Sequence, residues 1–145
     1  MEKKLSKRLS DIVNSLPLGK GLRVLEIGCG PGAMAREMAK RMDGGYILAI
    51  DRSANAIRQA KAASGKEIKT GALAFRQAAV EEFELESGEQ LFDIAVAIRV
   101  GALDGRHPEI EKEALAKIAG ALTKKGKLFI DGGDPLKEIP LSKYR

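Results

Sequence analysis

Residues 24–32 read V-L-E-I-G-C-G-P-G, and this stretch decides the fold. A short apolar run that holds one carboxylate, Glu26, leads into three glycines, Gly28, Gly30 and Gly32, and a helical pattern follows. In a parallel α/β sheet, a strand that runs into a glycine turn and then a helix opens a nucleotide pocket. We therefore predict an α/β fold that binds an adenosine-containing ligand.

The composition fits one domain of this kind. Of the 145 residues, 44% are hydrophobic but only 4% are aromatic, so the core consists of small aliphatic side chains, as in buried parallel strands. We expect a single domain at residues 1–145, with a helix and turn at 1–20, a core at 21–131 and a tail at 132–145. One cysteine, no secretory signal and no membrane-spanning apolar run predict a reduced cytoplasmic protein without membrane contact. We expect no metal site.

Charge is unevenly distributed along the chain, whose formal net charge is +5. Residues 1–70 hold 14 Lys and Arg against 7 Asp and Glu, whereas residues 71–145 hold 11 against 13. A basic half attracts phosphate or nucleic acid, but basic helix faces are usually just solvated. Because no aromatic and basic platform for stacking bases is present, nucleic acid is not the favoured partner.

Apolar spacing predicts alternating helices and strands. We expect helices at 3–15, 31–42, 54–63 and 108–122, and strands at 22–27, 46–50, 73–78, 92–98 and 127–131. An acidic connection at 81–90 has room for a short helix or turn, and the tail shows no periodicity. The first helix is expected to cover the sheet or the mouth of the pocket.

Two carboxylates narrow the choice of ligand. Asp51 ends the second strand, where it can accept hydrogen bonds from both hydroxyls of a ribose. Gly28, Gly30 and Ala33 also satisfy the G-x-G-x-x-A pattern of nicotinamide dinucleotide sites. Glu26 disfavours that alternative, because a carboxylate beside the turn repels a pyrophosphate but attracts an ammonium group. A ligand with an amino-acid end and an adenosine end satisfies both carboxylates.

Several segments carry a family resemblance. The first is residues 24–32, the second is I-L-A-I-D-R-S at 47–53, the third is F-D-I-A-V-A-I-R-V-G-A-L at 92–103, and the fourth is L-T-K-K-G-K-L-F-I-D at 122–131. Together they resemble the motifs of class I methyltransferases that depend on S-adenosyl-L-methionine. The likeness covers residues 21–131 and implies a three-layer Rossmann-like sheet, mainly parallel, in the strand order 3-2-1-4-5.

The resemblance implies a set of cofactor-binding residues: Glu26, Gly28, Cys29, Gly30, Gly32, Asp51, Arg52, Ala79, Val80, Ala97 and Arg99. The glycine turn would contact the methionine end, with Glu26 near its amino group. Asp51 would hold the ribose, and Arg52 would lie against the adenine. The segment from Ala97 to Arg99 would lie near the sulfonium.

The chain departs from the family pattern in two places. Many relatives carry an aspartate for the adenine amino group where this chain has Ala79, so a backbone group or Glu81 would make that contact. Only 14 residues follow Asp131, so we expect the usual last two strands to be lacking. The fifth strand would then be an edge, which the tail, a second copy of the chain or another protein must shield.

Methyl transfer is an in-line displacement that needs alignment and a water-free site more than it needs a base. His107, Asp104, Arg99 and Arg106 belong to the loop after the fourth strand, so they are candidates for contact with the acceptor. No N-P-P-Y segment follows that strand. We expect an enzyme that methylates an unidentified acceptor, with a small molecule favoured. The alternatives are a cofactor-binding, partner-dependent subunit and a nicotinamide-dependent oxidoreductase.

Overall fold

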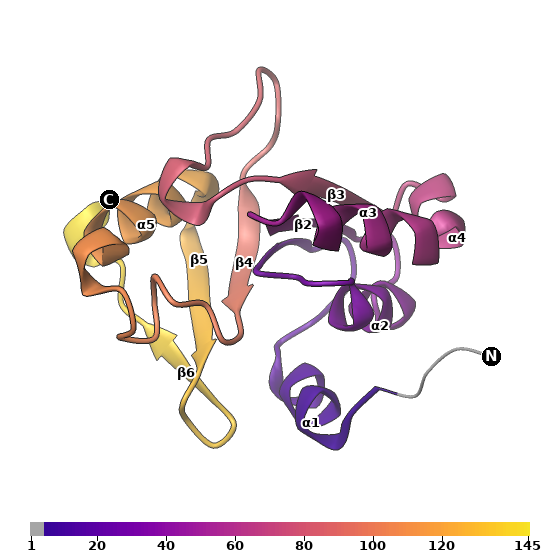
Figure 1. Cartoon of the computed structure of the whole chain (residues 1–145), viewed down its shortest axis with the longest axis horizontal. Helices are drawn as coiled ribbons and strands as arrows, with labels where there is room; N and C mark the ends of the chain where they lie inside the picture. Colours follow the sequence, from indigo (N-terminus) through magenta and orange to yellow (C-terminus); the bar gives the residue numbers. More distant parts are fainter. Residues whose placement is uncertain (1–4) are drawn as a thin grey trace.

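The structure is a computed structural model that describes residues 5–145, and it contains one six-stranded sheet (Figure 1). The strands are β1 (Arg23–Ile27), β2 (Tyr46–Asp51), β3 (Leu73–Gln77), β4 (Phe92–Ala97), β5 (Leu122–Asp131) and β6 (Leu136–Ile139). Their order is β3-β2-β1-β4-β5-β6, and β1 to β5 pair with one another in parallel. The predicted α/β class and the order 3-2-1-4-5 are confirmed.

The sheet has one strand more than we expected, and the tail forms it. Residues that we expected to lack regular structure form β6, which pairs antiparallel with β5 from Leu128 opposite Ile139 to Asp131 opposite Leu136. A strand of four residues is too short for an alternating pattern to stand out in the sequence. Leu136 and Ile139 both pack against the core, and the tail itself therefore shields the edge of β5.

Five α-helices flank the strands, and all but one correspond to an expected helix. They are α1 (Lys7–Ser15), α2 (Ala33–Arg41), α3 (Ala54–Ala63), α4 (Gly65–Lys69) and α5 (Pro108–Ala121), among the described residues. The first begins at Lys7 and not at residue 3, and residues 3–4 of that prediction lie outside the described residues. The short α4 was not expected. Ser6 caps α1 by accepting a hydrogen bond from the Leu9 amide, and Ser53 caps α3 in the same way through Ala56. The acidic connection contains the short 3₁₀ helix η1 (Val80–Glu82), and a second one, η2 (Ser142–Tyr144), lies near the chain end.

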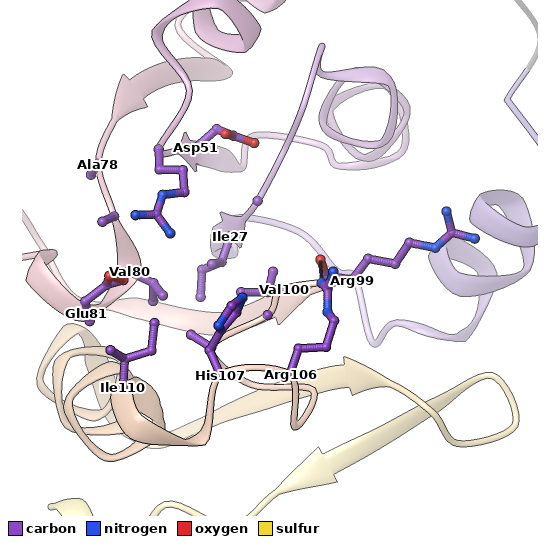
Figure 2. Close-up of a pocket in the computed structure, with 15 residues that line it drawn as sticks. Ile27, Asp51, Ala78, Val80, Glu81, Arg99, Val100, Arg106, His107 and Ile110 are labelled. Carbon is purple, nitrogen blue, oxygen red and sulfur yellow. Dashed lines mark hydrogen bonds between the residues drawn. The ribbon is translucent and has the colours of Figure 1, made fainter.

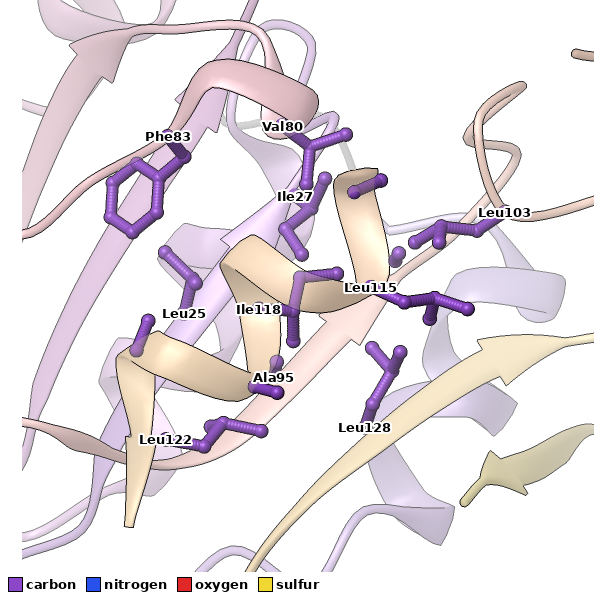
Figure 3. Close-up of a cluster of buried hydrophobic side chains, with 14 of the residues drawn as sticks. Leu25, Ile27, Val80, Phe83, Ala95, Leu103, Leu115, Ile118, Leu122 and Leu128 are labelled. Carbon is purple, nitrogen blue, oxygen red and sulfur yellow. The ribbon is translucent and has the colours of Figure 1, made fainter. Parts of the chain in front are cut away.

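Two apolar clusters fill the space on either side of the sheet, which makes the fold three-layered. Successive residues of β1 alternate between them: Val24 joins α1, α2 and α3 on one face, whereas Leu25 and Ile27 face α5 and η1 on the other. Figure 3 shows the second cluster, with Leu115 and Ile118 of α5 directed at the strands. Helices on both faces explain why these strands are apolar almost throughout.

Candidate functional site

Two neighbouring cavities lie at the carboxyl ends of the parallel strands. The first has a volume of about 320 Å³ and is lined by the ends of β1 and β2, the segment around η1, and the loop from β4 to α5 (Figure 2). The second, of about 710 Å³, is lined by α1, Glu26, the glycine turn and the start of α2. Gly28 and Arg99 line both cavities, so these residues mark where the two cavities meet.

The glycine turn after β1 forms the boundary between the cavities. Gly28, Gly30 and Gly32 have φ angles of 72°, 55° and 89°, in the left-handed region that other residues rarely adopt. A β-carbon on Gly28 would lie 2.8 Å from Cγ2 of Val100, and one on Gly32 would lie 2.9 Å from Cζ of Phe75. These positions therefore need glycine both for the backbone conformation and for the close approach of neighbouring side chains.

Asp51 braces this turn from the end of β2. Its Oδ2 accepts a hydrogen bond from the Gly30 amide at 2.9 Å, and its Oδ1 accepts one from the Ser53 amide at the same distance. A carboxylate has about four lone-pair sites, so both oxygens can still accept hydrogen bonds from a ligand. Asp51 lines the first cavity, where a ribose would lie.

Glu26 is the most unusual polar residue of the site. It is only 4% exposed, and its Oε1 has no hydrogen-bonding partner within residues 5–145. Burial, followed by the negative charge of Asp51, raises the pKa of Glu26 from 4.5 to about 8, although the positive charge of Arg36 opposes the shift. A buried carboxylate that faces a cavity without a partner fits a cationic ligand group, because an ammonium would both neutralise it and donate hydrogen bonds.

Cys29 lies in the same cavity but carries no reactive thiolate. Cys29 is 7% exposed, and its Sγ donates a weak hydrogen bond to the Gly30 carbonyl oxygen at 3.5 Å. Burial, with the nearby charges of Glu26 and Asp51, raises the pKa of the Cys29 thiol. The thiol therefore stays protonated and contributes apolar packing at neutral pH.

The remaining predicted residues fall into two groups. Arg52, Ala79, Val80 and His107 line the first cavity, as does Glu81, one of the groups expected to replace the missing adenine contact. Gly32, Ala97 and Asp104 line neither cavity: Gly32 precedes α2, Ala97 is buried in the core, and Asp104 holds Arg106. The roles assigned to individual residues stay predictions.

The turn after β4 is held by residues that sequence reasoning did not connect. Arg99 has a φ of 56°, its amide donates to Oδ1 of Asp131 at 3.1 Å, and its carbonyl accepts from Arg106 at 2.7 Å. The other oxygen of Asp131 accepts from Arg8 of α1 at 2.8 Å. Asp131 ends β5 as Asp51 ends β2, and this common position was the one signal that could have revealed it.

The comparisons with known proteins agree with this geometry. A family described as "Methyltransferase domain" matches residues 18–143. The chain belongs to this methyltransferase family. The predicted methyltransferase family and class I fold are thereby confirmed, and the match favours this family over the nicotinamide alternative. Among curated proteins, no sequence matches this chain.

Solved methyltransferase structures share the fold. Phosphoethanolamine N-methyltransferase 2 of Haemonchus contortus, solved in complex with S-adenosyl-L-methionine, is 26% identical to this chain with a TM-score of 0.69. The matched region covers 86% of this chain and 27% of the Haemonchus contortus chain. An S-adenosylhomocysteine complex of a methyltransferase from Thiobacillus denitrificans is 21% identical with a TM-score of 0.67, covering 87% and 48%. A TehB-like methyltransferase of Corynebacterium glutamicum is 22% identical with a TM-score of 0.65, covering 92% and 66%. The methyltransferase domain described here thus spans between about a quarter and two thirds of these structures.

Within residues 5–145, no helix of the domain has the length and apolar character needed to cross a membrane.

Proposed function

We propose that this methyltransferase domain binds S-adenosyl-L-methionine across the two cavities and methylates a small molecule. The observation that carries the proposal is the placement of two carboxylates, one in each of two adjoining cavities: Asp51 lines the first and Glu26 lines the second. Glu26, buried and unpartnered, would hold the ammonium group, and Asp51 would accept hydrogen bonds from the ribose hydroxyls. The bound cofactor would supply a methyl group on a cationic sulfur, at the joint marked by Gly28 and Arg99.

The protein's share of such a reaction is alignment. The lone pair of an acceptor atom bonds to the methyl carbon as the carbon–sulfur bond breaks, and the electron pair of that bond stays on sulfur. The glycine turn and the turn after β4 would fix the line of attack, while α1 and α5 would exclude water from the cavities. An acceptor that loses a proton could release it to His107, which lines the first cavity, or to solvent.

A small acceptor is supported by the size of the second cavity and by one relative. A volume of about 710 Å³ is within the range of pockets that hold small organic ligands. The Haemonchus contortus enzyme was also solved with phosphomonomethylethanolamine and S-adenosylhomocysteine. No N-P-P-Y segment, the sign of methylation on base or amide nitrogens, follows β4 in this chain.

Calorimetric titration with S-adenosylhomocysteine tests the donor site. We expect micromolar binding that weakens about tenfold or more in Asp51→Ala, because a charged hydrogen-bonding group is worth about 1.5–3 kcal/mol. Asp43→Ala is the matched control, since Asp43 is exposed and forms an ion pair with the exposed Lys20 at 3.7 Å. Unaltered binding in Asp51→Ala would contradict the proposed site. A partner-dependent binding subunit would bind equally well, so methyl transfer by the domain alone separates that alternative from the enzyme.

A further inference from the structure

Building on the methyl transfer proposed above, we propose that the acceptor is a small molecule with a carboxylate or phosphate group, and that Arg99 binds this group beside the transferred methyl. Arg99 lies where the two cavities meet, so a group bound to it is adjacent to both. Figure 2 shows the Arg99 side chain extending away from His107 and Arg106, on the side where α1 lies.

The backbone of Arg99 is fixed from two sides. A non-glycine residue at a φ of 56° is strained by about 1–3 kcal/mol, and such strain persists only where neighbouring groups determine it. Here Asp131 accepts the Arg99 amide hydrogen and the Arg106 guanidinium donates to the Arg99 carbonyl oxygen. The turn therefore directs the side chain, in the way expected of a residue that positions a ligand.

The charges around the cavities leave Arg99 without a partner. Four arginines line the two cavities: Arg8, Arg52, Arg99 and Arg106. Arg8 pairs with Asp131 and Arg106 with Asp104, and neither aspartate lines a cavity. Among the described residues, the guanidinium groups of Arg52 and Arg99 make no hydrogen bond or ion pair. Arg52 lines the first cavity alone, whereas Arg99 lines both cavities. An unpaired guanidinium at a cavity wall matches the forked geometry of a carboxylate or phosphate.

The start of α2 offers a separate site for the carboxylate of the cofactor. Ala33 and Met34, in the first turn of α2, line the second cavity, and Gly32 provides no side chain to cap that turn. Free amides at a helix start can bind the cofactor's carboxylate. The second cavity is also much larger than an amino-acid end requires. Arg99 is thus left for a second anion.

A cationic cofactor strengthens the case for an anionic acceptor. The sulfonium would lie near Arg99, and two positive charges at short range repel each other. An anionic acceptor between them would neutralise both charges. Since Arg8 and Arg106 already pair with Asp131 and Asp104, the cations left at the cavity walls are Arg52 and Arg99. The carboxylates left there are Asp51 and Glu81, because Glu26 is mostly protonated at neutral pH.

The test uses two simple probes on the full chain saturated with S-adenosylhomocysteine. Inorganic phosphate and acetate are titrated separately while NMR follows the signals of Arg99, Val100 and Gly101. We expect millimolar binding of at least one probe, weakened at least tenfold in Arg99→Met, and the tighter probe identifies the acceptor's anionic group. Arg58→Met is the control, because Arg58 is exposed on α3 and lines neither cavity. Met keeps the β-carbon and so leaves the backbone strain unchanged.

Three outcomes separate the alternatives. If neither probe binds, or if Arg99→Met leaves their affinity unchanged, the proposed anion site is wrong. If Arg99→Met weakens S-adenosylhomocysteine tenfold but spares 5′-methylthioadenosine, which lacks the amino-acid end, Arg99 binds the cofactor's own carboxylate and the proposal is overturned. If the unaltered chain binds no S-adenosylhomocysteine, the proposed donor site fails instead, whatever the probes show.

Discussion

The turns after β1 and β4 reach the same edge of the sheet but are held in different ways. The turn after β1 places glycine at each of its three left-handed positions, so its conformation follows from the local sequence. The turn after β4 places Arg99 in a left-handed conformation, and contacts from Asp131 and Arg106 hold it there. The conformation of the turn after β1 is therefore encoded locally, whereas that of the turn after β4 depends on residues far apart in the chain.

The largest expected effect is on the local turn. Gly28→Val combines an unfavourable φ of 72° with a β-carbon 2.8 Å from Val100, so the turn must move. We expect S-adenosylhomocysteine affinity to fall by about 100-fold or more, which corresponds to about 2.7 kcal/mol. Gly21→Val is the matched control, since Gly21 has a φ of 69° but no neighbour within 4 Å. Equal losses of affinity in both variants would show that general destabilisation, not the turn, is responsible.

Glu26→Gln should have the next largest effect. The substitution keeps the shape of the side chain but removes the charge that would pair with the ligand ammonium. We expect calorimetry to show about a tenfold loss of S-adenosylhomocysteine affinity, the low end for a charged hydrogen bond, with 5′-methylthioadenosine unaffected. Glu37→Gln, on the partly exposed pair with Arg41, is the control. If S-adenosylhomocysteine and 5′-methylthioadenosine lost affinity equally, Glu26 would not act on the amino-acid end of the ligand, and its proposed role would be wrong.

The raised pKa of Glu26 predicts a pH dependence with a definite sign. Because the pKa rises from 4.5 to about 8 on folding, the folded chain binds more protons between these values. The unliganded domain should therefore lose stability as pH rises from about 5 to 8, and Glu26→Gln should flatten this slope. Ammonium binding would ionise Glu26, so titration at pH 7 should release close to one proton, detectable by calorimetry in buffers of different ionisation enthalpy. Binding without proton release would contradict the assigned partner.

The smallest expected effect concerns the long-range support of the second turn. Asp131→Asn retains an oxygen for the Arg99 amide but removes the charge that pairs with Arg8. We expect thermal unfolding to show a loss of about 1 kcal/mol, since both side chains are partly exposed, and less than a threefold change in S-adenosylhomocysteine affinity. We also expect faster hydrogen exchange of the Arg99 amide in this variant. Glu138→Gln, on the exposed pair with Lys127, should change neither quantity.

Sequence reasoning succeeded where a pattern was long or chemically constrained. The strands at residues 23–27, 46–51 and 92–97 are apolar runs bounded by turns, and each was expected within one residue at either end. The four-residue strand β6 and the five-residue α4 were missed, because elements this short show too few repeats of a helix or strand period. Asp131 was read only as the end of a strand, since nothing local distinguishes a carboxylate that binds a turn 32 residues earlier.

The amino-acid sequence by itself determined the parallel α/β core, the glycine turn and the two carboxylates of the donor site, because each depends on residues close together in the chain and on the alternation of strand and helix. Only the tertiary structure decided that β6 covers the edge of β5, that Glu26 is buried without a partner, and that Arg99 stands unpaired between two cavities. These properties are set by which distant residues meet when the chain folds, and by how much water is excluded from between them.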